Sequence, residues 1–165
     1  MKKRTTLITL VTALLSTQAF AESGWWRDAN DHNKAWANSD GSNFQALIKS
    51  RALDSDSPYV SFSLVGSNKS FCSNKGDEYN GHTTMKVNDQ RIDFSMTCYK
   101  NEFLNMVPKT HKGLDYIFKE FNSYRNKQMT FVVTYEDQPD WVFTFPTRNF
   151  GQYYSSLKKS LKDTL

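Results

Sequence analysis

The stretch RIDFSMTCY, residues 91–99, alternates apolar and polar side chains with the period of two that a half-buried β-strand requires. Residues 83–87 form a second stretch of this kind, and the residues between the two, Asn88-Asp89-Gln90, are typical of a turn. The two stretches therefore predict a β-hairpin. One face of its second strand carries the apolar side chains, those of Ile92, Phe94, Met96 and Cys98.

The same patterns extend outward along the chain. Period two recurs where Val60, Phe62 and Leu64 alternate with serines, and again at residues 128–136 and 141–145, so these stretches predict three more strands. Apolar stripes with helical spacing predict three helices, at residues 43–52, 113–125 and about 149–161.

These elements predict an α+β fold for a single domain at residues 44–165. We expect one antiparallel sheet of about five strands, with two main helices packed on one face and one disulfide. The segment 66–81 is rich in Gly, Asn, Ser and Lys and is expected to be a loop. A chain of 165 residues with 38% hydrophobic residues suits one globular domain rather than two.

The first 21 residues have the pattern of a bacterial signal peptide. Three basic residues at positions 2–4 precede an apolar stretch at residues 5–17, and the segment ends in Ala19-Phe20-Ala21. Small residues at alternate positions fit the subsites of a signal peptidase, so we expect cleavage after Ala21. The mature protein would then be periplasmic or secreted, and no later apolar run is long enough to span a membrane.

The net charge of the mature protein would be close to zero. The whole chain has 21 Lys and Arg residues against 17 Asp and Glu residues. Three of the basic residues lie in the predicted leader and the first acidic residue is Glu22, so 18 basic and 17 acidic residues would remain. This balance removes the argument for electrostatic steering toward polyanions, and no nucleic-acid partner is expected.

Cys72 and Cys98 are the two cysteines of the sequence. An even pair in an exported protein predicts one disulfide, which would fasten the segment 66–81 to the inward face of the hairpin. The pair lacks the C-x-x-C spacing and the neighbouring histidines of redox and zinc sites. A structural bridge is therefore expected.

Residues 22–43 are polar, yet they contain three of the four tryptophans, Trp25, Trp26 and Trp36. The segment does not have the pattern of a regular element, so it is expected to be an irregular lead-in to the domain. Large rigid rings in such a segment can provide contact area at small entropic cost. These three tryptophans are therefore the candidate binding residues, and the alternative is that they pack on the domain.

The sequence contains no recognised motif for catalysis, for a cofactor or for a metal ion. It has no G-x-S-x-G nucleophile elbow and no Gly-rich phosphate loop, and its histidines, His32, His82 and His111, are far apart in the chain. We therefore expect a non-enzymatic protein without cofactor or metal. In the alternative, His32 would work with Asp28 or Asp31 in proton transfer.

Together these features predict an exported bacterial protein that binds another macromolecule of the envelope, as an accessory, inhibitor or immunity factor. Two alternatives stay open. One is a secreted effector or small hydrolase that uses His32. The other is a module that binds peptidoglycan or another glycan through its aromatic residues.

Overall fold

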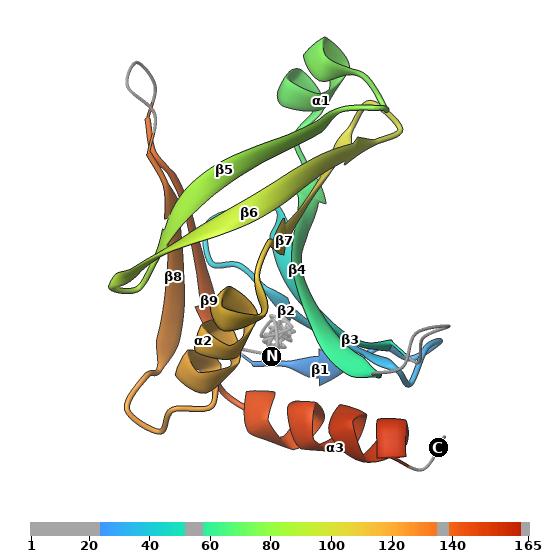
Figure 1. Ribbon diagram of the computed structural model, residues 1–165, viewed down its shortest axis with the longest axis vertical. Coiled ribbons are helices and arrows are strands. Elements are labelled where there is room, and N and C mark those ends of the chain that lie inside the picture. Colours follow the sequence, from blue (N-terminus) through green and yellow to red (C-terminus); the bar gives the residue numbers. More distant parts are fainter. Residues whose placement is uncertain (1–23, 52–57, 135–138, 163–165) are drawn as a thin grey trace, which may run out of the picture.

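The computed structural model describes residues 24–51, 58–134 and 139–162 (Figure 1). The predicted signal peptide, residues 1–21, lies outside the described residues. The described strands are β1 (Trp26–Arg27), β2 (Lys34–Asn38), β3 (Phe44–Arg51), β4 (Tyr59–Ser67), β5 (Asn80–Val87), β6 (Gln90–Tyr99), β7 (Phe103–Pro108), β8 (Gln128–Val133) and β9 (Trp141–Pro146). The described helices are α1 (Lys69–Lys75), α2 (His111–Phe121) and α3 (Phe150–Lys162).

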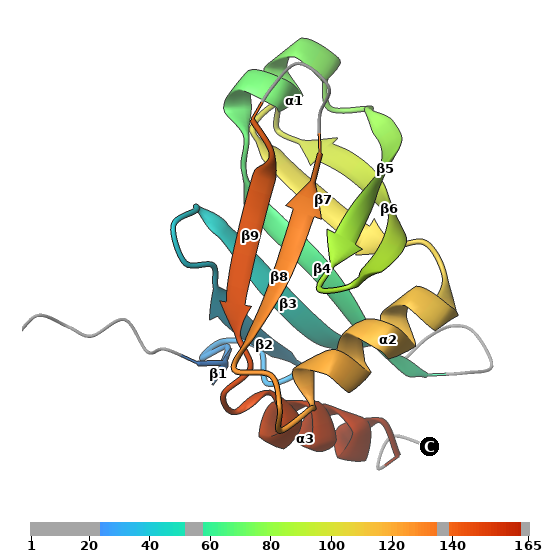
Figure 2. The ribbon, with the colours of Figure 1, turned by 90° about the vertical axis from the view of Figure 1, so that its left-hand side faces the viewer.

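The nine described strands form one antiparallel sheet in the order β1-β2-β3-β4-β7-β6-β5-β8-β9. The sheet curls into a half-barrel (Figures 1 and 2). Its curl is strong enough to bring the turn between β2 and β3 against the last strand. There the Asp40 amide donates a hydrogen bond to the Thr144 carbonyl at 2.8 Å.

The hydrophobic core fills the concave side of the sheet, where α2 and α3 pack (Figures 1 and 2). Phe121 of α2 lies near its centre, with its ring 5.2 Å from Trp25, 5.9 Å from Phe62 and 4.9 Å from Phe150 between centroids. Edge-to-face and stacked aromatic pairs of this kind add to the stabilisation from burial alone. No helix in the described part of the chain has the length and apolarity that a membrane span requires.

The predicted sheet of about five strands with two main helices is wrong, because the described sheet has nine strands and a third helix is present. Within the stretch 43–52, which was predicted to be helical, Phe44–Arg51 forms β3. Its apolar residues satisfy both periods, since Phe44, Leu47 and Ile48 form a helical stripe while Phe44, Ala46 and Ile48 alternate. The residues form a strand because β3 is hydrogen-bonded to β2 on one side and to β4 on the other.

Three further segments differ from the prediction. The lead-in at 22–43, expected to be irregular, contains β1 and β2, because β3 offers a strand edge on which β2 can pair. The segment 66–81 contains α1, which begins after Asn68, whose side chain accepts a hydrogen bond from the Phe71 amide. The strand β7 was not predicted. By contrast, the hairpin of β5 and β6 is confirmed, as are α2, β8, β9 and α3 within a few residues at their ends.

Candidate functional site

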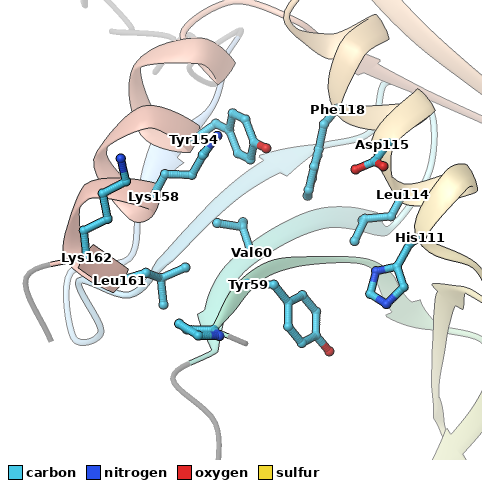
Figure 3. A pocket seen from close by; sticks show the side chains of 11 residues that line it. Tyr59, Val60, His111, Leu114, Asp115, Phe118, Tyr154, Lys158, Leu161 and Lys162 are labelled. Carbon is cyan, nitrogen blue, oxygen red and sulfur yellow. The ribbon is translucent and has the colours of Figure 1, made fainter. Parts of the chain in front are cut away.

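A cleft of about 350 Å³ lies between the start of β4, α2 and α3 (Figure 3). All three elements contribute apolar side chains to it: Val60 from β4, Leu114 and Phe118 from α2, and Leu161 from α3. Polar groups surround this apolar lining. They belong to Tyr59, His111, Asp115, Tyr154, Lys158 and Lys162.

The spacing of residues along the two helices explains why they share this cleft. In α2, His111, Leu114, Asp115 and Phe118 follow one another at i, i+3, i+4 and i+7, which places them on one side of a helix. The α2 helix begins after Thr110, whose hydroxyl accepts a hydrogen bond from the Gly113 amide at 3.1 Å. The cleft therefore depends on where this cap sets the start of α2.

The α3 wall follows the same rule. Tyr154, Lys158, Leu161 and Lys162 fall at i, i+4, i+7 and i+8, so they line one side of α3. Leu161 is buried, whereas Lys158 and Lys162 are exposed. The α3 wall thus combines an apolar base with two ammonium groups at the rim, as Figure 3 shows.

Tyr154 is fixed between the two helices. Its ring lies 4.7 Å from that of Phe118 and 5.5 Å from that of Phe150, and the Lys158 ammonium stands 5.4 Å from the ring centroid. Burial, and secondarily the negative charge of Asp115, raise the pKa of the Tyr154 hydroxyl. The hydroxyl is therefore neutral at physiological pH and can donate a hydrogen bond to a ligand.

The charge around the cleft is unevenly distributed. Lys158 and Lys162 stand on the α3 side, and Asp115 stands on the α2 side (Figure 3). A second, more open groove shares Tyr154 and both of these lysines and adds Lys159. The α3 side of the cleft is therefore cationic and suits an anionic group of a ligand.

The polar part of the cleft lining consists of imidazole, carboxyl, phenol and ammonium groups. The described residues that line it include neither serine, threonine nor cysteine. The His111 ring meets the Tyr59 ring edge-on, with 6.3 Å between centroids.

No known protein family, curated protein or solved structure matches this chain. Within the described ranges, no group of three or more His, Cys, Asp and Glu side chains is placed to hold a metal ion.

Trp25 lies in the core and not on an exposed arm. Its side chain is 1% exposed, and its indole Nε1 donates a hydrogen bond to the Pro146 carbonyl at 3.0 Å. Its ring packs edge-on against Phe121 and Phe150. Trp25 was a candidate contact residue from the sequence, but in the structure it is a core residue. The reason is that its ring packs between residues of α2 and α3.

Trp26 and Trp36 lie elsewhere, side by side on the outer face of the sheet. They are directly paired across β1 and β2, and both are half-buried. Trp36 stands between the buried residues Ala35 and Ala37, so its side chain points away from the core. Its indole Nε1 donates to the Asp28 carboxylate at 2.9 Å, which fixes the orientation of the ring.

The proposed partnership of His32 with Asp28 or Asp31 has no support in the geometry. The Asp28 carboxylate accepts hydrogen bonds from Trp36 and from the amides of Asn30 and Asp31. The Asp31 carboxylate pairs with the Lys34 ammonium at 2.9 Å. These donors lower the pKa of both carboxyl groups, chiefly Trp36 for Asp28 and Lys34 for Asp31.

The predicted disulfide between Cys72 and Cys98 is confirmed, with 5.5 Å between the two Cα atoms. Both half-cystines are buried, and the bridge joins α1 to β6. Its role is structural, because it ties a short helix to the rim of the sheet.

None of the cleft residues was among the candidate binding residues from the sequence. The signal was present in α2, where a histidine and an aspartate follow the same helical stripe as Leu114 and Phe118. The stripe predicts which face of α2 is buried. It does not predict that α3 packs beside this face. The cleft becomes visible only when α3, which follows α2 after two strands, folds back beside it.

Proposed function

We propose that this protein is exported to the bacterial envelope and binds another macromolecule there, without enzymatic chemistry, as an accessory, inhibitor or immunity factor. The cleft between α2 and α3 is the observation that carries this proposal, because its apolar lining and polar rim suit binding. Export is supported by the leader pattern of residues 1–21 and by the disulfide, which is typical of oxidising compartments.

The chemistry of the cleft specifies what the partner presents. An apolar side chain of the partner would fill the space over Val60, Leu114 and Phe118. An acidic group beside it would meet Lys158 and Lys162, which stand on the α3 rim. We therefore propose a partner surface that carries an apolar residue next to a carboxylate.

Affinity capture tests this function. The exported protein, with its disulfide oxidised, is used to capture partners from the envelope fraction of its own source, in parallel with the variant Lys158→Glu/Lys162→Glu. We expect one stoichiometric partner with the wild type and at least about tenfold less of it with the variant, since like charges now oppose each other. The matched control reverses two exposed lysines at the α1 end of the molecule, which is opposite α3 in Figure 1: Lys69→Glu/Lys100→Glu should retain the partner.

Two results would contradict the proposal. If the partner is captured equally by the cleft variant and the control, the cleft is not the contact surface. If the folded wild type captures no stoichiometric partner, binding of an envelope protein is not its function.

A second candidate function, glycan binding, is favoured by Trp26 and Trp36. The two residues are paired across β1 and β2 on the outer face, and the Asp28 carboxylate holds the Trp36 ring in place. Such a rigid aromatic surface suits the face of a sugar ring. Retention on isolated cell wall tests this candidate, and Trp36→Ala should abolish the retention while Lys158→Glu leaves it unchanged.

A further inference from the structure

The strand β5 is paired along its whole length on one side but at one end only on the other. It pairs with β6 from Asn80 to Val87. Its pairing with β8 is limited to Lys86 and Val87. The next two residues in this register, Met85 and Val133, are not paired, so β5 separates from the end of β8 there and leaves a gap, as Figures 1 and 2 show.

Two hydrogen bonds establish which backbone groups face this gap. The Cys98 amide donates to the Tyr79 carbonyl, so residue 79 and the alternate residues after it face β6. The Asn88 amide donates to the Thr130 carbonyl at 2.8 Å, so the even-numbered positions face β8. The backbone groups of Asn80, His82 and Thr84 therefore point into the gap, and the described chain provides no strand to pair with them there.

The other two edges of the sheet are protected. At β9 the Thr144 carbonyl and amide bond to the Asp40 amide and the Ser39 hydroxyl. At the opposite end of the sheet, β1 is only two residues long. Short edge strands and covered edges are the usual protection against pairing with another chain. The open part of β5 has neither, and it contains no proline and no lysine between Asn80 and Met85.

A row of aromatic rings crosses the concave side of the molecule from β5 to β9. Tyr79 lies directly over Gly81, since a Cβ atom at that glycine would clash with its hydroxyl. The Tyr79 ring contacts Phe71 of α1 with 5.4 Å between centroids, and Phe71 contacts Trp141 of β9 at 5.8 Å. All three rings are partly buried. The Tyr79 ring thus places apolar surface on the concave side, next to the open edge of β5.

From this geometry we propose that the β5 edge binds an extended segment of a partner protein, which pairs as an additional strand with Asn80–Thr84. An unpaired strand edge is complementary to another extended backbone, and the rings select apolar side chains at alternate positions. The segment enters from the open end of the gap, because the pairing of Lys86 and Val87 with β8 closes the other end. This inference rests on the proposed function, a protein-binding role, and adds a contact distinct from the cleft.

The experiment uses a phage-displayed library of random short peptides, selected on the full oxidised protein. His82→Pro removes an amide that faces the gap and leaves the bonds to β6 in place, and proline is tolerated on strand edges of this kind. His82→Ala is the matched control, because it removes the side chain but keeps the amide. We expect the selected peptides to alternate apolar residues and to bind His82→Pro at least about tenfold more weakly than His82→Ala.

A second measurement does not depend on the folding of any variant. In the wild type, hydrogen exchange at the His82 and Thr84 amides should be fast without peptide and slow markedly when a selected peptide is bound. The Gly81 and Thr83 amides, which face β6, should be protected in both states.

Selected peptides that bind both variants equally and leave the His82 amide unprotected would overturn the inference, as would a library that yields no binder. The cleft variant Lys158→Glu/Lys162→Glu should bind the peptides like the wild type. Peptide binding therefore tests the β5 edge alone. The proposed function is tested separately, by partner capture with the cleft variant.

Discussion

Trp25 lies inside the core and Trp36 on the outer face of the sheet, so their substitutions should have very different costs. Trp25→Ala leaves a cavity against Phe121 and Phe150 and removes the donor to the Pro146 carbonyl. We expect it to lower the free energy of unfolding by about 3–5 kcal/mol. Trp36→Ala should cost clearly less, because its ring is half-buried. Chemical denaturation of both variants tests this, and equal losses would contradict the assignment of Trp25 to the core.

Asp28 should have a lower pKa than an ordinary aspartate, chiefly because of one neighbour, Trp36. The Trp36 indole, followed by the Asn30 amide, lowers the pKa of its carboxyl group in the folded state. The carboxylate therefore stabilises the fold above the unfolded-state pKa near 4, and this contribution is lost as the pH falls through the folded-state pKa. In Trp36→Phe the pKa of Asp28 should rise toward its usual value, as an NMR titration would measure.

Asp31 is the internal control for that titration. Its pKa is lowered chiefly by Lys34, so Trp36→Phe should leave it low. A titration in which the Asp28 pKa does not move in Trp36→Phe would show that the indole is not the cause of the shift.

At the scale of elements, α1 depends on its disulfide. The helix has seven residues, which is too short for stability on its own, and Cys72 anchors it to Cys98 of β6. The bridge closes a loop with a sequence separation of 26. The double variant Cys72→Ala/Cys98→Ala should therefore lose about 3 kcal/mol of unfolding free energy on the chain-entropy estimate.

Thermal unfolding of this double variant, with the wild type in reductant as a comparison, tests the effect. Limited proteolysis should in addition cut first near α1, because that helix loses its anchor. A variant with unchanged stability and unchanged cleavage sites would show that packing of Phe71 alone holds α1 in place.

The elements that the sequence predicted are those whose own residues show one unambiguous period. The hairpin of β5 and β6 needs only the turn between them, and α2 shows its stripe within its own residues. The strands β2 and β3 were mispredicted because their local pattern is ambiguous: the apolar residues of β3 fit both a helical and a strand period, and β2 is a five-residue strand in a polar segment. Pairing of β3 with β2 and β4 settles both strands. The cleft was missed because residues from α2, α3 and β4, which are far apart in the chain, form it together.

For the whole molecule, closure of the curl connects the binding surfaces. The contact between the β2–β3 turn and β9 holds the two halves of the sheet around α2 and α3. Those halves carry the surfaces proposed for binding: the cleft lies beside β4, and the open edge of β5 faces β8 and β9. A loosened closure should therefore disturb both surfaces although it touches neither.

Ser39→Ala tests the closure directly. The Ser39 side chain is 8% exposed, and its hydroxyl accepts a hydrogen bond from the Thr144 amide at 3.2 Å. Removing it leaves that amide without its acceptor, at a cost of about 1–3 kcal/mol. Exchange at the neighbouring Asp40 amide, which bonds to the Thr144 carbonyl, should accelerate as β9 separates. Ser61→Ala, which removes a hydroxyl from the outer face of β4, should leave this exchange unchanged; equal exchange in the two variants would mean that packing of Phe44 on Phe143 closes the sheet by itself.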